Sequence, residues 1–152
     1  MAARAEDLAP AVPVEDRRLL IVAAWWHDLG YAPQLRETGM HQVDGALHLE
    51  GCGYRERLCA LVAHHSAAEC EAHERGLAAA LRRWPREESS VADALWMADM
   101  TTGPGGETLD YPTRLAEIME RYDAESVVAR AMTAARPSIT EAIERTEARL
   151  PV

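Results

Sequence analysis

Histidine and carboxylate side chains stand at the ends of several apolar runs in this 152-residue sequence. "AAWWHDLGYAP" ends an apolar run on His27-Asp28, "LVAHHSAAE" ends another on His64-His65, and "ALWMADMTT" encloses Asp99. Imidazoles and carboxylates hold Fe, Mn, Zn or Co, and one carboxylate can bridge two ions. A carboxylate among apolar neighbours also needs a partner, such as a metal, an arginine or a helix cap. The candidate metal ligands are His27, Asp28, His41, His64, His65 and Asp99.

Each of these residues also has a purely structural interpretation. His27 can be a core histidine that bonds a backbone carbonyl, while Asp28 faces solvent at a helix end. The pair His64-His65 can be a solvated helix end that the helix dipole stabilises. His48 shares a predicted helix face with a candidate ligand, although a surface histidine is the more common case.

Helices are the elements predicted to position these side chains. Apolar residues recur at helical spacing, and the sequence has no strand-like alternation, repeat or low-complexity tract. Alanine is abundant and phenylalanine is absent, which favours helix. The predicted helical stretches are 2–9, 16–30 with Asp16 as the cap, 41–50, 54–66, 67–83, a helix through Asp99 capped by Ser89 or Ser90, a helix from Pro112 to Tyr122, and 124–150 divided by Pro137. The predicted fold class is all-α.

Charge and cysteine spacing narrow the class of protein. The formal net charge is -9 and no Lys/Arg-rich run occurs, so no nucleic-acid partner is expected. Cys52, Cys59 and Cys70 have no CxxC spacing and are interpreted as reduced thiols. The longest apolar run, residues 19–26, is too short to cross a bilayer. These features predict a cytoplasmic protein with one domain over residues 1–152 and no membrane partner.

In chain order, the candidate ligands resemble those of the HD-domain superfamily of metal-dependent phosphohydrolases. "AAWWHDLGYAP", "HQVDGALHL", "LVAHHSAAE" and "ALWMADMTTGP" are similar to the ligand-bearing helices of that family, over roughly residues 1–122. The resemblance implies an HD-domain helical bundle of about seven or eight helices, with C-terminal helices over 124–150 outside the core. Ile139, Ile143 and Leu150 could pack on this core or pair with a second copy as a homodimer.

The resemblance also implies a cofactor and a ligand set. The cofactor is a divalent metal, one or two ions of Fe, Mn, Zn, Co, Ni or Mg. His27, Asp28 and Asp99 would hold one ion, and Asp28, His41 and either His64 or His65 would hold a second. The catalytic role is assigned to Asp28 and His65, in a site where the metals produce hydroxide near neutral pH.

The sequence departs from the family pattern at two points. The first histidine of the family belongs on the helix before His27-Asp28, but residues 1–26 contain no histidine. By this alignment the missing ligand would fall just upstream of Met1. The second departure is Tyr31, because the cyclic-dinucleotide phosphodiesterase branch of the family usually has lysine there. That branch is therefore not the expected one.

The leading functional hypothesis is a phosphohydrolase that acts on a small phosphate ester or nucleotide through a metal-activated water. Two alternatives are a two-iron HD-type oxygenase, whose ligand order resembles this one, and a non-catalytic HD protein with an incomplete metal site. Scattered arginines are most often surface residues, yet four of them could meet the phosphate. They are Arg36, Arg55, Arg114 and Arg121.

Overall fold

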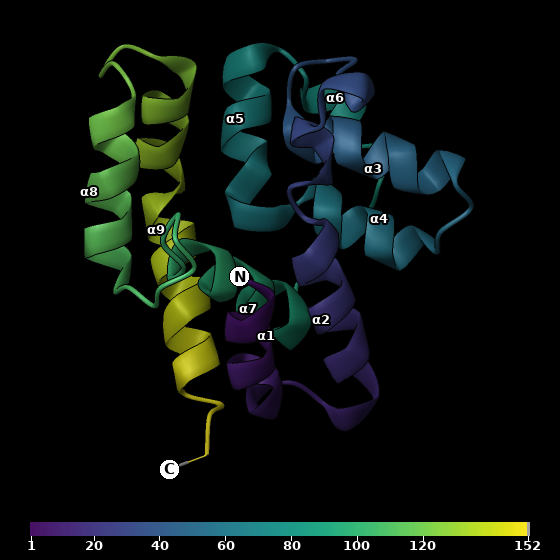
Figure 1. Cartoon of the computed structure of the whole chain (residues 1–152). Helices are drawn as coiled ribbons and strands as arrows, with labels where there is room; N and C mark the ends of the chain where they lie inside the picture. Colours follow the sequence, from purple (N-terminus) through teal and green to yellow (C-terminus); the bar gives the residue numbers. More distant parts are fainter. Residues whose placement is uncertain (152) are drawn as a thin grey trace.

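Helices make up nearly all of the regular structure in the computed structural model, which describes residues 1–151 (Figure 1). The α-helices are α1 Ala2–Leu8, α2 Arg17–Trp26, α3 His41–Gly51, α4 Glu56–Ala63, α5 Ala68–Arg75, α6 Ala78–Leu81, α7 Ser90–Met100, α8 Tyr111–Arg121 and α9 Val127–Glu147. Over these 151 residues the only strand-type pairing is an isolated bridge between Thr102 and Thr108. The all-α prediction is confirmed, and all of these helices except the single turn α6 have seven residues or more.

Helix α7 is the centre of the fold. It packs against α1, α2 and α9, and only three of its eleven residues escape full burial. Ser89 caps the helix, since its hydroxyl accepts a hydrogen bond from the backbone N–H of Ala92 at 3.2 Å. Asp99, in the last turn of α7, is one of the three residues that are not fully buried, and its side chain is 15% exposed.

The remaining helices form two sides around this centre. Helix α3 packs on α4 on one side, while α8 lies beside α9 on the other, and α5 contacts α9 between them (Figure 1). Ile139 and Ile143 of α9 are buried, and α9 packs along α7. Packing on the core is therefore observed for these two residues, while pairing with a second copy stays a prediction. No helix within residues 1–151 combines the length and apolar content that crossing a membrane requires.

Two predicted helices have different limits in the structure. The stretch 67–83 was expected to be one helix, but Gly76 adopts a φ of 71° and ends α5, so α6 is separate. Pro137 was expected to divide the last helix, but α9 runs through it. Pro137 and Thr133 are both exposed, so solvent can reach the carbonyl that Pro137 leaves without its helical partner.

Asp16 was expected to cap α2, and this prediction is wrong. Its side chain makes no cap hydrogen bond. Both of its carboxylate oxygens instead accept hydrogen bonds from Arg57, at 2.7 and 2.8 Å. A bidentate partner from a distant helix therefore competes successfully with the local cap.

Asp93 ties α7 to the C-terminal half of α9. Its nearly buried carboxylate accepts hydrogen bonds from Arg145, at 2.7 and 2.9 Å, and from Arg149 at 2.7 Å. Burial favours the neutral acid, but the two guanidinium groups outweigh this and hold the pKa of Asp93 below its ordinary value. The charged form of Asp93 therefore stabilises the folded state.

We predict that Asp93→Asn lowers the free energy of unfolding by about 1–2 kcal/mol at pH 7, as measured by urea denaturation. A depressed pKa in the folded state gives stability that is fully present above the unfolded pKa, near 3.8, and that is lost as the pH falls through the folded value. The difference from wild type should thus be constant above about pH 5 and shrink below pH 4. Glu141→Gln is the control, because Glu141 is exposed and lies 3.7 Å from Arg145. An equal loss in both variants would contradict the prediction.

Candidate metal centre

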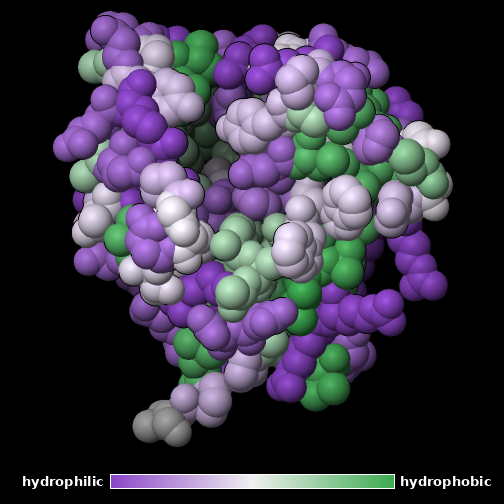
Figure 2. All heavy atoms as spheres, in the orientation of Figure 1, coloured by the Kyte–Doolittle hydropathy of each residue, from purple (hydrophilic) through white to green (hydrophobic). Residues whose placement is uncertain are grey.

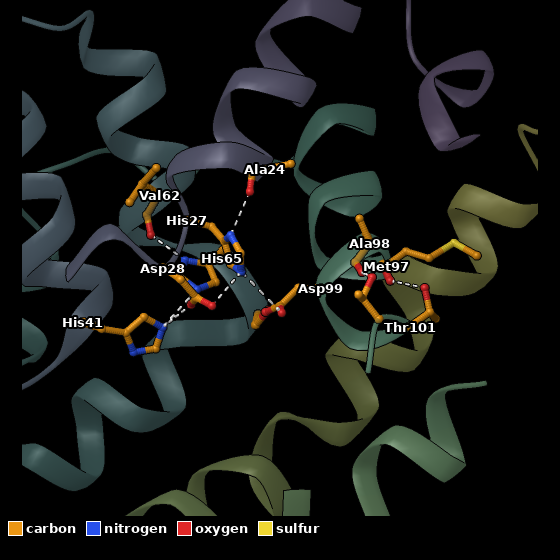
Figure 3. Close-up of polar contacts among 12 residues, drawn as sticks. Ala24, His27, Asp28, His41, Val62, His65, Met97, Ala98, Asp99 and Thr101 are labelled. Atoms are coloured by element: carbon orange, nitrogen blue, oxygen red, sulfur yellow. Dashed lines mark hydrogen bonds and ion pairs between the residues drawn. The ribbon is translucent and has the colours of Figure 1, made fainter. Parts of the chain in front are cut away.

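Five of the six predicted ligands converge on one point in the interior (Figure 3). His27 and Asp28 follow α2, His41 begins α3, His65 lies in the turn after α4, and Asp99 is near the end of α7. His27 Nε2 is 3.1 Å from Asp28 Oδ2 and 3.6 Å from Asp99 Oδ1. His41 Nε2 is 3.2 Å from His65 Nε2 and 3.4 Å from Asp28 Oδ1.

The five side chains form two overlapping groups that share Asp28. Ligand atoms of Asp28, His41 and His65 all lie within 4.8 Å of one another. His27, Asp28 and Asp99 form the other group. One oxygen of Asp28 faces His27 and the other faces His41, so this carboxylate would serve as a ligand in both groups.

The hydrogen bonds of the imidazoles test whether these residues fit a metal. His27 Nδ1 lies 2.9 Å from the carbonyl oxygen of Ala24, and His65 Nδ1 lies 2.6 Å from that of Val62. A carbonyl can only accept, so each Nδ1 carries a proton, and Nε2 is the nitrogen turned toward the centre, where it can bind an ion in its deprotonated form. This is the arrangement in which metal-binding histidines are usually held. The residues therefore fit a divalent ion.

The electrostatics of the centre also favour a cation. Burial disfavours charge on His27, but hydrogen bonds to Asp28 and Asp99 outweigh burial and raise its pKa to about 10. Burial, with the neighbouring His65, lowers the pKa of His41 to about 3, and burial also lowers the pKa of His65. For Asp28 and Asp99, burial acts to raise the pKa, but the interaction with His27 is stronger. The pKa of each carboxylate is therefore held below its ordinary value. Two anionic carboxylates beside two neutral imidazoles thus stabilise positive charge.

His64 is the one predicted ligand that the structure does not bring into this group. Its Nδ1 lies 2.9 Å from Glu69 Oε1 and its Nε2 lies 2.9 Å from the carbonyl oxygen of Trp84. Both ring nitrogens are thus engaged elsewhere, and of the two histidines between which the sequence left the choice open, His65 is the one that lies beside Asp28 and His41. His48 is exposed, as expected for a surface histidine.

A close backbone contact holds the turn after His27-Asp28 against α3. A Cβ atom at Gly30 would overlap the carbonyl oxygen of His41 and lie 2.6 Å from the backbone nitrogen of Gly45. Only glycine allows this approach. The contact brings Asp28 to the N-terminal turn of α3, where His41 stands.

Asp44 fixes the loop that leads into His41. Its buried carboxylate accepts hydrogen bonds from the backbone N–H and the hydroxyl of Thr38, at 2.8 and 2.7 Å, and from the N–H of Gly39 at 3.1 Å. These bonds satisfy the hydrogen-bond donors of the loop that immediately precedes the first turn of α3. The position of His41 is therefore set on both sides, by Gly30 and by Asp44.

Strained backbone presents His65 to the centre. Ser66 and Ala67 have φ values of 51° and 56°, in the left-handed region that residues with a side chain rarely adopt. Such strain costs on the order of 1 kcal/mol per residue and is typical of functional sites. The turn also places the Ser66 hydroxyl 2.5 Å from Asp99 Oδ2, to which it donates.

A cleft of about 500 Å³ opens onto the centre, between the side built of α3 and α5 and the side built of α8 and α9. Figure 2 shows it as a recess in the surface. Arg114 and Arg121 of α8 line the cleft and both bind Glu117. Two guanidinium groups share one carboxylate there, so this wall keeps one positive charge. The other two arginines of the sequence prediction, Arg36 and Arg55, are not part of the lining.

An apolar wall faces the charged part of the cleft. Residues of α8 and α9 supply it, and they are Ile118, Val128, Ala131, Met132 and Ala135. Such a surface can receive an uncharged part of a substrate while the polar groups fix its orientation.

Three residues at or near this site were not singled out from the sequence. Asp44 carried a usable signal, because an acidic residue in the first turn of a helix commonly bonds the N–H groups before it. Ser66 and Arg75 carried none. Ser66 meets Asp99 only through the fold, and Arg75, which lines the cleft, pairs with Glu71 at 2.7 Å like an ordinary surface residue.

Comparison with known proteins gives one match. A family model described as "HD domain" matches residues 1–125. No curated protein and no solved structure matches the chain. The matched residues include all five side chains of the centre.

We predict that Gly30→Ala separates the turn from α3 and thereby disrupts the centre. Thermal or urea denaturation should show a loss of at least about 2 kcal/mol, because the added methyl group has no room. Metal content, measured by mass spectrometry, should fall as Asp28 moves from His41. Gly51→Ala is the matched control, since a Cβ at Gly51, at the end of α3, meets nothing within 4 Å. Wild-type stability in the Gly30 variant would contradict the close contact.

Proposed function

Because this chain belongs to the HD-domain family, we propose that it is a metal-dependent phosphohydrolase acting on a small phosphate ester or nucleotide. One observation carries the proposal. Five side chains direct electron pairs to one point beside a cleft whose opposite wall has an excess of arginine. Phosphoryl chemistry uses this combination of metal and cationic side chains to balance the charge of the substrate.

When bound, a divalent ion lowers the pKa of a coordinated water and neutralises phosphate charge. His27, Asp28 and Asp99 would hold one ion, and Asp28, His41 and His65 would hold a second. The side chain of Asp28 is 53% exposed, whereas that of Asp99 is 15% exposed. Asp28 is therefore the ligand that a substrate in the cleft meets first.

His65 is better suited to holding an ion than to exchanging protons with a substrate. It is 1% exposed, and its Nδ1 is committed to the carbonyl of Val62. Its proposed catalytic contribution is thus to present the lone pair of Nε2 in a fixed orientation. Ser66 does the same for Asp99 by donating to the oxygen that faces away from His27.

The size and lining of the cleft support a small substrate. A volume of about 500 Å³ accommodates a phosphate ester or a mononucleotide. Arg114 and Arg121 would bind the phosphate, and the apolar wall would receive the organic part. Glu117 orients both guanidinium groups, so that little freedom is lost when an anion binds.

We predict that the chelator-stripped protein, given Mn, Fe, Co, Ni, Zn or Mg, releases inorganic phosphate from at least one phosphomonoester or nucleotide. Asp28→Ala should lower this rate by at least about 100-fold, because it removes the shared ligand. Asp7→Ala is the control, since it removes an exposed carboxylate from α1.

The other outcomes of this experiment identify the alternative functions. Absence of metal-dependent phosphate release from the whole substrate panel would overturn the proposal. Oxygen uptake by the iron-loaded protein, without phosphate release, would indicate an oxygenase. A chain that binds no metal and turns over nothing would be a non-catalytic HD protein.

We further predict that Arg121→Gln raises KM for the phosphate substrate about 10-fold and leaves kcat within about 3-fold, as expected for loss of ground-state anion binding. Steady-state kinetics measure both constants. Arg55→Gln, which removes an exposed arginine outside the cleft, should leave both unchanged. Equal effects of the two substitutions would assign the change to overall charge instead of the cleft.

A further inference from the structure

The three histidines of the centre are not held in the same way. His27 and His65 each place Nδ1 on a backbone carbonyl, of Ala24 and Val62 respectively. Among residues 1–151, no hydrogen-bond partner of His41 Nδ1 is found, although His41 Nε2 faces the centre like the others. Hydrogen bonding therefore fixes the orientation of two rings but leaves that of His41 to another contact.

The aromatic ring of Tyr31 supplies such a contact. The rings of Tyr31 and His41 lie 4.0 Å apart between centroids and only 13° from parallel. A neutral imidazole stacked this closely on a phenol ring cannot turn about its side-chain bonds without losing the contact or colliding with it. The stack therefore defines the plane in which His41 Nε2 can point.

The turn that carries Tyr31 is itself anchored to the centre. Tyr31 donates its backbone N–H to the carbonyl of Asp28 at 3.0 Å, and Gly30 is pressed against the backbone of His41 and Gly45. The ligand Asp28 and the ring that covers His41 thus belong to one short turn. Motion of this turn would therefore displace Asp28 and His41 together, and both belong to the group that includes His65.

We infer that Tyr31 is a positioning residue for the metal ligand His41, and that its ring sets the affinity of the ion site formed by Asp28, His41 and His65. This inference rests on the metal site of the proposed function. The site formed by His27, Asp28 and Asp99 does not depend on the stack, because a carbonyl holds His27 and a hydroxyl holds Asp99.

The ring, and not the hydroxyl, is the part that matters. Tyr31 is 52% exposed at the edge of the cleft, and within residues 1–151 no hydrogen bond of its hydroxyl is found. Phenylalanine would keep the stacking surface, whereas leucine would keep apolar bulk without a flat face. These two substitutions therefore separate positioning from general burial.

The test is titration of the metal-free protein with Co²⁺, followed by calorimetry and visible absorption. Tyr31→Leu should weaken one of the two Co²⁺ sites about 10-fold or more and leave the other unchanged. Tyr31→Phe should bind as the wild type does. Tyr122→Leu is the matched control, because Tyr122 is another exposed tyrosine that lines the cleft.

A second measurement requires neither metal nor activity. The ring current of residue 31 shifts the NMR signal of the His41 Cε1–H in the metal-free protein. This shift should persist in Tyr31→Phe and disappear in Tyr31→Leu, and an unchanged dispersion of the other signals shows that the variant is folded.

The possible results separate this inference from the proposed function. Wild-type Co²⁺ binding by Tyr31→Leu, or an equal loss in the Phe and Leu variants, would overturn it. A wild-type chain that binds no Co²⁺ would overturn both this inference and the proposed function. A chain that binds Co²⁺ with the expected dependence on Tyr31, yet releases no phosphate, would support the inference and contradict only the proposed function.

Discussion

The structure depends on one electrostatic constraint. Imidazole nitrogens and carboxylate oxygens from distant helices meet at one point, where the protein supplies little positive charge to offset their mutual repulsion. The imidazoles of His27 and His65 each donate a proton to a backbone carbonyl, and the carboxylates of Asp28 and Asp99 lie against His27. Such a group is stable only when positive charge is shared among its members. The neighbouring carboxylates raise the pKa of His27, which favours a proton there, and a divalent ion would supply more positive charge.

The backbone segments that carry the ligands are the tightly packed and strained parts of the fold. Gly30 is in closer contact with α3 than any residue with a side chain would allow, and Ser66 and Ala67 lie in a left-handed conformation. The buried faces of α3, α4 and α7 hold these segments in position. Ordinary helix packing thus provides the free energy that keeps a strained, charged centre assembled.

The ligands also differ in how freely they can move. His65 is buried and Asp99 nearly so, and both are fixed by hydrogen bonds, whereas Asp28 is half exposed and shared between two groups. His41 is held by a stacked ring instead of a hydrogen bond. Asp28 is thus the ligand that the protein constrains least, and it lines the cleft.

The sequence by itself determined the helical fold class, most helix limits and the five side chains that meet, because helical periodicity and capping are local and ligand types are visible as letters. It did not determine the break at Gly76, the continuity of α9 through Pro137, or the partner of Asp16, since each depends on which face is buried or which residue lies across the fold. The sequence left open whether His64 or His65 belongs to the second ligand group. Only the tertiary structure separated them, because neighbouring residues in a tight turn point in different directions and the surrounding helices decide which one meets Asp28.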